Sequence, residues 1–242
     1  MSEDTGIRIN KYVASAGVCS RREADKLIEE GRVTINGRPA LAGDKVNEGD
    51  SVKVGSKLVK MQEERTVLAY YKPVGVTCTE KDEHAEITVK EAVRYKERVT
   101  YAGRLDKESE GLLIMTNDGD LIQSMMKGEN RHEKEYLVKI SKPVTREFVE
   151  KMSGGIYLKD LDKTTRPCKV ERVTKDSFSI VLTQGLNRQI RRMCETLDVK
   201  VLQLKRVRVL TVTLGGLKPG EYRKLSNTEV ESLRSALKGK RK

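Results

Sequence analysis

Asp106 stands at a point in this chain where a carboxylate can do chemistry. It lies in the segment GRLDKESEG (residues 103–111), and the apolar run LLIM (residues 112–115) follows directly. An apolar run bounded by glycine and by the turn sequence NDG predicts a buried strand. Since catalytic groups tend to sit on loops that a rigid scaffold holds, this position makes Asp106 a candidate catalytic residue.

A predicted helix near residue 190 carries a row of arginines. In NRQIRRMCETL (residues 187–197) the apolar side chains at 190, 193, 194 and 197 share one helical face. Arg188, Arg191 and Arg192 follow the same spacing offset by two residues, which turns them to roughly the opposite face. Asn187 is the expected N-cap. A surface salt-bridge face is the ordinary alternative, but a single acid on that face cannot balance three arginines, so we expect an anionic partner.

The charge of the chain is uneven. Lys and Arg outnumber Asp and Glu by 48 to 36, which gives a net charge of +12 in 242 residues. Residues 185–242 alone hold 15 basic and 5 acidic side chains, a net of +10, of which the terminal KGKRK supplies only +4. Such asymmetry predicts a polyanionic partner, most simply nucleic acid, whereas a solubilising tail accounts only for the last five residues.

Several other classes of protein are disfavoured by composition. No apolar run approaches the roughly 20 residues that span a bilayer, and no signal-peptide pattern opens the chain, so we expect a cytoplasmic protein without a membrane partner. The 4 cysteines are far apart and only 2 histidines are present, so we expect reduced thiols and no metal site. The chain has no phosphate-cradling glycine motif and no unusually apolar stripe, so we expect no cofactor and a monomer.

The first 60 residues are expected to form a small α/β module. Apolar side chains at 9, 12, 13 and 16 have helical spacing, and a second helix begins at Ser20, where SRRE fits a capping box. Short strands are expected in VTINGRP (33–39), with a turn at Asn-Gly, and in GDSVKV (49–54). A solvated helix face is the ordinary explanation of the cations on this second helix and just after it, but they also form a candidate phosphate-binding patch: Arg21, Arg22, Lys26 and Arg32.

The rest of the chain reads as a linker (residues 61–66), a larger domain (67–237) and a basic tail (238–242). Strand patterns follow one another at 66–71, 99–101, 112–116, 135–140, 170–173, 178–182 and 201–214. Helical spacing is limited to 87–95, the arginine segment and a last helix that begins at Ser226 with a capping pattern. Strands in succession with few helices predict an α+β domain, built on a largely antiparallel sheet with flanking helices.

Four motifs of the larger domain resemble those of bacterial ribosomal-RNA pseudouridine synthases of the RsuA type. GRLDKESEGLLIMTNDG resembles their catalytic motif, QGLNRQIRRM a second motif, and YYKPVG and KEYLV two supporting ones. The closest likeness, through NRHEKEYLV and QGLNRQIRRMCE, is to members that act on large-subunit ribosomal RNA. The string RINKYVASAGVCSRREADKLIEEGRVTINGRPA resembles the small RNA-binding domain named after small-subunit ribosomal protein four.

The resemblance implies an enzyme that isomerises uridine to pseudouridine within ribosomal RNA, either free or in a ribosomal assembly intermediate. It makes Asp106 the essential residue and Arg191 the guanidinium that pairs with it and favours the ionised carboxylate. It also implies that Tyr136 holds the target base and that Arg104 fills the space left when the base flips out. Whether Asp106 attacks the sugar or removes a ribose proton to give a glycal stays open. The RNA contacts predicted in this domain are Lys72, Arg188 and Arg192.

Rival functions account for fewer of these residues. The segment NDGD (residues 117–120) offers too few ligands for a metal loop and more simply forms a turn. A glycosidase needs two facing carboxylates, and nothing marks Glu108 or Glu110 as the second. The alternative that stays open is a noncatalytic RNA-binding or ribosome-assembly protein, which would keep the basic surfaces but would not need Asp106 beside Tyr136 and Arg191.

Overall fold

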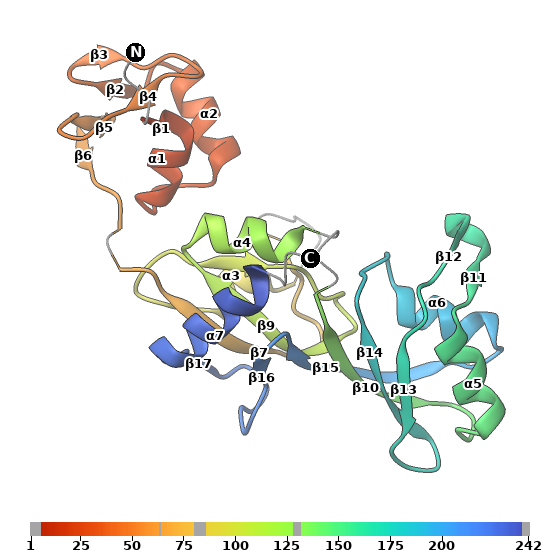
Figure 1. The fold of residues 1–242 in the computed structure, drawn as a ribbon. Helices are drawn as coiled ribbons and strands as arrows, with labels where there is room; N and C mark the ends of the chain where they lie inside the picture. The colour runs from red at the N-terminus through yellow and green to blue at the C-terminus, as the bar shows by residue number, and fades with distance from the viewer. Residues whose placement is uncertain (1–5, 63, 80–85, 128–131, 239–242) are drawn as a thin grey trace. The chain divides into compact units, whose positions relative to one another are not determined.

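The computed structural model describes residues 6–62, 64–79, 86–127 and 132–238 (Figure 1). The chain divides into two compact units, which are described separately. The first comprises Met1–Thr66 with Tyr95–Val99 and Asn117–Gly119, and the second comprises Val67–Arg94, Thr100–Thr116 and Asp120–Lys242. Glu63 of the predicted linker, the first two residues of NRHEKEYLV and residues 239–242 of the predicted tail lie outside the described residues.

The first unit is the expected small module of two helices and short strands. Ser20 accepts a hydrogen bond from the Glu23 amide and the Glu23 side chain accepts one from the Ser20 amide, so the predicted capping box is confirmed. Eleven buried side chains of the described helices, strands and connecting segments, Ile9 and Val52 among them, form its core. Its elements are α1 (Ile9–Ser15), α2 (Arg21–Glu29), β1 (Ile7–Arg8), β2 (Val33–Ile35), β3 (Arg38–Pro39), β4 (Lys45–Val46), β5 (Val52–Val54) and β6 (Lys57–Val59).

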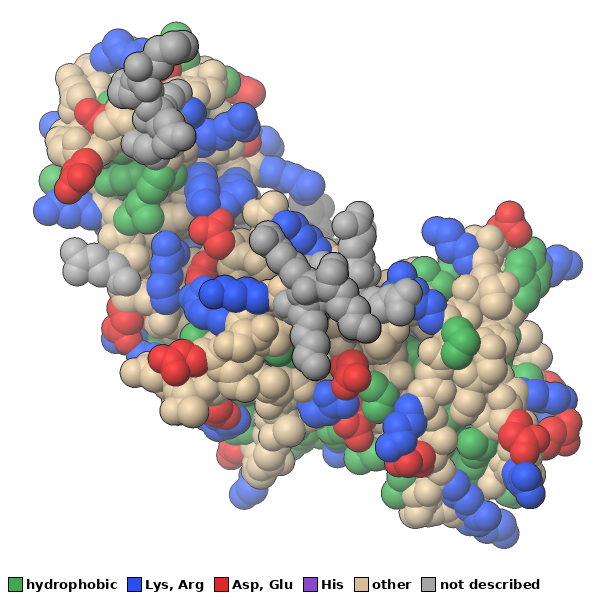
Figure 2. All heavy atoms as spheres, in the orientation of Figure 1, with side chains coloured by type: hydrophobic (Ala, Val, Ile, Leu, Met, Phe, Trp, Pro, Cys, Tyr) green, Lys and Arg blue, Asp and Glu red, His purple; other side chains and the backbone are tan. Residues whose placement is uncertain are grey.

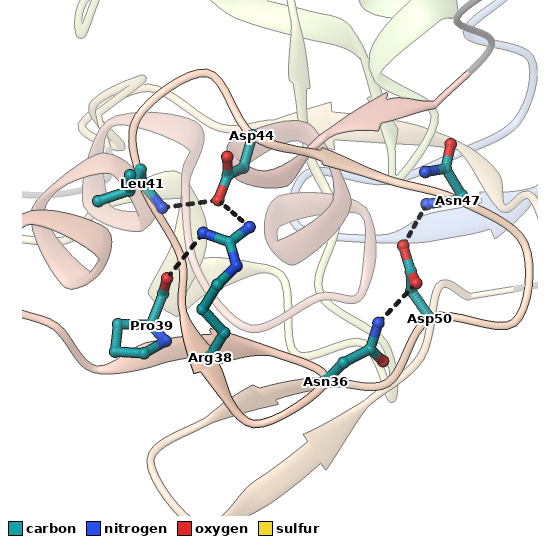
Figure 3. A network of polar contacts seen from close by, with 7 residues as sticks. All are labelled: Asn36, Arg38, Pro39, Leu41, Asp44, Asn47 and Asp50. Atoms are coloured by element: carbon teal, nitrogen blue, oxygen red, sulfur yellow. Dashed lines mark hydrogen bonds and ion pairs between the residues drawn. The ribbon is translucent and has the colours of Figure 1, made fainter.

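Asp44 and Asp50 form hydrogen bonds that fix the loops of this module (Figure 3). Asp44 accepts hydrogen bonds from the Leu41 amide at 2.9 Å and from the Arg38 guanidinium at 3.0 Å. Asp50 accepts from the Asn47 amide at 2.7 Å and from the Asn36 side chain at 2.8 Å. These donors lower the pKa of both carboxyls, with the backbone amides as the largest cause. Local hydrogen bonds from both aspartates therefore help to fix the shape of these loops.

The second unit is built on a 9-stranded sheet whose main path runs β13-β14-β10-β15-β9-β7-β17, with β8 pairing β9 and β16 pairing β15. All pairings in it are antiparallel except the one between β15 and β9, so the predicted α+β class with a largely antiparallel sheet is confirmed. The strands of this sheet are β7 (Val67–Lys72), β8 (Thr100–Ala102), β9 (Glu110–Thr116), β10 (Lys134–Ile140), β13 (Lys169–Arg172), β14 (Ser177–Leu182), β15 (Val201–Val209), β16 (Val212–Thr213) and β17 (Tyr222–Lys224).

Helices and a small hairpin complete this unit: α3 (Val89–Ala92), α4 (Gly119–Met126), α5 (Arg146–Gly154), α6 (Gln189–Thr196), α7 (Asn227–Lys238), a 3-10 turn (Lys159–Leu161), β11 (Tyr157–Leu158) and β12 (Lys163–Thr164). Two hydrophobic cores form around the sheet. The first core joins α5 and α6 to β10, β13, β14 and the start of β15. The second core joins α4 and α7 to β7, β9 and the end of β15. None of the helices in the described part of the chain is long and apolar enough to cross a membrane.

The two cores meet where β15 lies parallel to β9. Only two residue pairs form this seam, Lys205 with Glu110 and Arg206 with Gly111. Gly111 has a φ of +107°, and a Cβ atom at this position would lie 2.3 Å from the Arg206 carbonyl oxygen. Glycine is therefore required here both by the backbone conformation and by the close approach of the two strands.

Four sequence predictions of local structure are corrected. The helices α4 and α5 were not expected, because NDG was interpreted as a turn and the helical spacing of Phe148, Val149 and Met152 was missed. The helix expected at 87–95 is only the four-residue α3. The run expected at 201–214 is two strands, β15 and β16, because Leu210 takes a φ of 51° and turns the chain. In such short segments, tertiary packing overrides the intrinsic helix and strand propensities of the residues.

Candidate active site and RNA-binding surface

Asp106 lies on a loop of residues 103–109 that joins β8 to β9. The loop is tied down on both sides of the aspartate. The Leu105 amide donates to Cys78 Sγ at 3.5 Å, and the Lys107 carbonyl accepts from the Gly75 amide at 2.8 Å. The Asp106 side chain is half-buried and forms no hydrogen bond or ion pair with any described residue. The fold thus presents an unengaged carboxylate on an anchored loop, as its position before β9 predicts.

Lys72 is not an RNA contact, and that prediction is wrong. The side chain is 0% exposed, and its ammonium donates to the carbonyls of Pro73 and Val76, each at 2.8 Å. Burial lowers the pKa of Lys72 to about 8, while the negative charge of Asp106 acts in the opposite direction. The lysine at the end of β7 therefore closes the turn of residues 73–76, which in turn holds the Asp106 loop.

The arginines of α6 do have acidic partners, contrary to the expectation from their local sequence. Arg188 pairs with Glu108 at 3.0 Å. Arg191 donates to the Glu108 backbone carbonyl at 3.1 Å and lies 3.8 Å from its carboxylate. Arg192 pairs with Asp160 at 2.6 Å. The hydrogen bond from Arg188 is the largest cause that lowers the pKa of Glu108, followed by the charges of Arg188 and Arg191.

The N-terminus of α6 also differs from the prediction. The N-cap is Arg188, in a left-handed conformation, and not Asn187. The Asn187 side chain and carbonyl instead accept hydrogen bonds from Arg192, and Gln189 Oε1 accepts from the Leu186 amide. Side chains of the first turn of α6 therefore bind the backbone and side chains of the residues that precede the helix, and so fix the turn before it.

The structure brings the α6 arginines and the Asp106 loop together but does not pair Arg191 with Asp106. Among the described residues, the polar contacts of Arg191 go to Glu108, two positions after Asp106. Its Nε is buried without a hydrogen bond, as is the hydroxyl of Ser109 on the same loop. These atoms leave hydrogen-bonding capacity unused where α6 meets the loop.

Tyr136 and Arg104 reach this region from different elements. Tyr136 lies on β10 opposite Arg206 of β15 and packs, half-buried, against the first core. Arg104 is exposed on the Asp106 loop, and its carbonyl accepts a hydrogen bond from Arg206 at 3.4 Å. Arg206 itself is 3% exposed and was not singled out from the sequence. The sequence did contain an indication of its burial. Arg206 lies two positions after Leu204, so in a strand both side chains point to the same, buried face of β15.

The first unit carries the other group of predicted contacts. Arg21, Arg22, Lys26 and Arg32 are all exposed, and Figure 2 shows Lys and Arg side chains gathered on the helical side of this unit. A cavity of about 500 Å³ beside α1 is lined by further cations that the sequence analysis missed: Arg8, Lys11 and Lys45, together with Arg21. These residues are far apart in sequence, so only the fold shows that they share a surface. Within the described residues, no group of His, Cys, Asp and Glu side chains is arranged to hold a metal ion.

Known proteins match this chain over both units. A family model described as RNA pseudouridylate synthase matches residues 66–196, and an S4 domain model matches residues 7–52. The dual-specificity RNA pseudouridine synthase RluF of Escherichia coli (strain K12) is 44% identical over 235 residues, 96% of this chain and 80% of that protein. The ribosomal large subunit pseudouridine synthase B of Bacillus subtilis (strain 168) is 34% identical over 236 residues, 94% of this chain and 96% of that protein. A crystal structure of a pseudouridylate synthase superposes with a TM-score of 0.69 at 28% identity, covering 94% of this chain and 99% of that one.

Proposed function

The chain belongs to the RNA pseudouridylate synthase family and is an isomerase with an RNA-binding S4 domain, and from this premise we propose that it modifies ribosomal RNA of the large subunit with Asp106 as its essential residue. The family match confirms the resemblance of the four motifs. It also removes the alternative of a noncatalytic RNA-binding protein.

One observation carries the assignment to Asp106. Its carboxylate is half-buried, has no hydrogen bond or ion pair with any described residue, and sits on a loop anchored at Leu105 and Lys107. A carboxylate bound in a salt bridge would have to be released before it could react, whereas this one is available. Glu108 and Glu110 are engaged instead, Glu108 with arginines and Glu110 with the Tyr71 hydroxyl at 2.8 Å.

The reaction moves the ribose from a ring nitrogen of uracil to carbon-5 without a change in oxidation state. Asp106 acts either as a nucleophile on the sugar or as the base that removes a ribose proton, and both routes need the ionised carboxylate at the sugar. Tyr136 offers an aromatic face to the flipped base, and Arg104 occupies the vacated space in the RNA stack. Arg191, held by Glu108, orients the loop that carries Asp106.

The substrate assignment rests on the names of the relatives. One relative is called a ribosomal large subunit pseudouridine synthase and another a dual-specificity RNA pseudouridine synthase. The RNA contacts of the S4 module are Arg21, Arg22, Lys26 and Arg32, and those of the larger domain are Arg188 and Arg192. Such cations bind phosphate and leave the choice of uridine to other groups.

The test is release of tritium from RNA labelled at carbon-5 of uridine, because that position exchanges its hydrogen for the ribose bond. Wild type should release tritium from large-subunit ribosomal RNA, and Asp106→Asn should release none while its RNA affinity stays within about twofold. Asp162→Asn is the matched control, since Asp162 is exposed and its bond to the Tyr157 hydroxyl survives the change.

Two outcomes would overturn parts of this proposal. If Asp106→Asn lost RNA affinity as far as activity, Asp106 would be structural rather than catalytic. If wild type released tritium only from small-subunit or transfer RNA, the large-subunit assignment would be wrong while the isomerase activity would stand.

A further inference from the structure

We propose that Arg206 is a positioning residue for the isomerisation, which holds the Asp106 loop at a fixed place relative to Tyr136 across the seam between the two cores. This inference rests on the proposed function, because Asp106 and Tyr136 take their roles from it. Arg206 itself touches neither substrate nor base in this account. It acts through the backbone of the loop.

The contacts of Arg206 link three elements. From β15, its Nε donates to the Leu112 carbonyl of β9 at 2.7 Å. Its Nη1 donates to the Arg104 carbonyl at 3.4 Å, two residues before Asp106. On its other side, Arg206 lies opposite Tyr136 of β10. A single planar guanidinium thus binds both the start of the Asp106 loop and β9, the strand that follows this loop. Its own residue is paired with Tyr136 on β10.

The backbone pairing across this seam is short. The strands β9 and β15 share only two residue pairs, whereas β7 and β9 share six and β10 and β14 share six. Asp106 belongs to the side of the second core, and Tyr136 packs against the first core. If one core shifted relative to the other, the distance between Asp106 and a base packed on Tyr136 would change. The two hydrogen bonds of Arg206 therefore help to fix the geometry of the site.

The charge of Arg206 supports a role beyond stability. Arg206 is 3% exposed as a residue, and among the described residues no carboxylate forms an ion pair with it. Removing a cation from water without a counter-ion is costly, so an apolar side chain would be the simpler way to fill this space. The same charge helps lower the pKa values of Lys72 and Lys134, after burial as the larger cause. Arg206 therefore acts on the charge of two neighbouring lysines, and one of them, Lys72, also interacts with the charge of Asp106.

Arg206→Lys tests the proposal because it keeps the charge but loses the fork that reaches two carbonyls. With saturating enzyme in excess over RNA, the rate constant of tritium release should fall about 10- to 100-fold, while the RNA dissociation constant stays within about twofold. Under enzyme excess the rate constant does not depend on the folded fraction, so a loss of stability alone would leave it unchanged. Amide hydrogen exchange in residues 103–109 should become faster in the same variant.

The matched control is Arg208→Lys on the same strand. Arg208 pairs with Glu135 at 2.8 Å and with Glu133 at 3.1 Å, and among the described residues it forms no hydrogen bond with residues 103–109. This variant should keep the wild-type rate constant and the wild-type exchange in residues 103–109. Arg206→Met, if it folds, should show the same loop exchange as Arg206→Lys with an equal or larger loss of rate.

The outcomes separate this proposal from the function on which it rests. Faster loop exchange with a lower rate constant at unchanged affinity supports positioning by Arg206. An unchanged exchange or an unchanged rate constant in Arg206→Lys overturns it. If wild type released no tritium from any RNA, the proposed function would fail, and the exchange of residues 103–109 would still show whether Arg206 holds the loop.

Discussion

The two basic helices of this chain, α2 and α6, use their cations in different ways. On α2, Arg21 and Arg22 are exposed and form no ion pair with any residue in the described ranges. On α6, Arg188 and Arg191 converge on Glu108, and Arg192 binds Asp160. A cation without a protein partner is available to phosphate alone, whereas Arg188 and Arg192 also bind a carboxylate of the protein, so their proposed RNA contacts come in addition to a structural role. Two helices with similar basic sequences can therefore have different roles. The difference lies in whether a carboxylate of the protein binds their arginines.

The largest effect that would sharpen this comparison is expected from Arg191→Ala. Losing the bond to the Glu108 carbonyl frees the end of the Asp106 loop, so the rate constant of tritium release at saturating enzyme should fall about 100- to 1,000-fold. RNA affinity should change less than about threefold. Glu195→Ala, on the same helix and exposed, should match wild type. A weaker affinity with an unchanged rate would place Arg191 with the phosphate-binding cations of α2.

Lys72 extends the comparison to a cation whose partners are carbonyls. Its pKa is lowered to about 8, so between that value and the ordinary 10.5 the unfolded chain binds a proton that the folded chain does not. Lys72 alone should therefore make the free energy of unfolding rise with pH across this window by about 3 kcal/mol. The thiols of Cys168 and Cys194, whose pKa values burial raises, act in the opposite direction, so the contribution of Lys72 is measured as a difference between variants. In chemical denaturation from pH 7 to 10.5, wild type should gain about 3 kcal/mol relative to Lys72→Met, whereas Lys200→Met should follow wild type. A constant difference between wild type and Lys72→Met would mean that Lys72 does not have this effect.

Much of the fold follows from local signals in the sequence. The capping box at Ser20, the strand after Gly111 and the hairpin between β13 and β14 each depend on neighbouring residues, and each is observed. The missed features depend on distant partners. Glu108 and Arg188 are 80 positions apart, and Arg206 and Arg104 are 102 apart. Rules based on periodicity or helix capping do not detect such distant pairs. The arginines of α6 were therefore predicted to bind an anion outside the protein.

Lys72 was misplaced for a related reason. A lysine after a buried strand and before proline reads as an exposed cation, because lysine is rarely buried. Here the ammonium finds two carbonyls within its own turn, and that closure depends on the packing of residues 73–76 beneath the Asp106 loop. The position of Asp106 on a loop before a buried strand was predictable from the sequence. Its surroundings were not.

A moderate effect is expected from removing the unpartnered cations of α2. In the double variant Arg21→Ala and Arg22→Ala, the RNA dissociation constant should rise about 10-fold at low salt, and the salt dependence should weaken by roughly one to two counter-ions. The rate constant at saturating enzyme should stay the same. Filter binding over a salt series measures both quantities. Lys53→Ala with Lys57→Ala, two exposed lysines of the same module, is the matched control.

That control also defines the result that would break the comparison. If both double variants lost affinity equally, α2 would contribute only general positive charge. If the α2 variant lost rate and kept affinity, its arginines would act like those of α6.

The smallest effect is expected from an exposed pair, Arg223 with Glu229. The Arg223 bond is the largest cause that lowers the pKa of Glu229 to about 2, with the Ser226 amide next. Both side chains are 36% exposed, so solvent screening limits the contribution, and Glu229→Gln should reduce the free energy of unfolding by only about 1 kcal/mol. The difference should be present above pH 4.5 and disappear as the pH falls towards 2, as thermal unfolding can show. Glu231→Gln, on the same helix, should have no comparable effect.

The seam at Gly111 has a consequence for how freely the sequence of this protein can change. The two cores on either side contain aliphatic side chains that can exchange for others of similar volume with modest losses. Position 111 offers no such latitude, because a single added methyl group would meet the backbone of Arg206 at 2.3 Å. Mutational tolerance should therefore be lowest at a residue that has no side chain at all, and any accepted change there would have to arise together with a new pairing of β9 and β15.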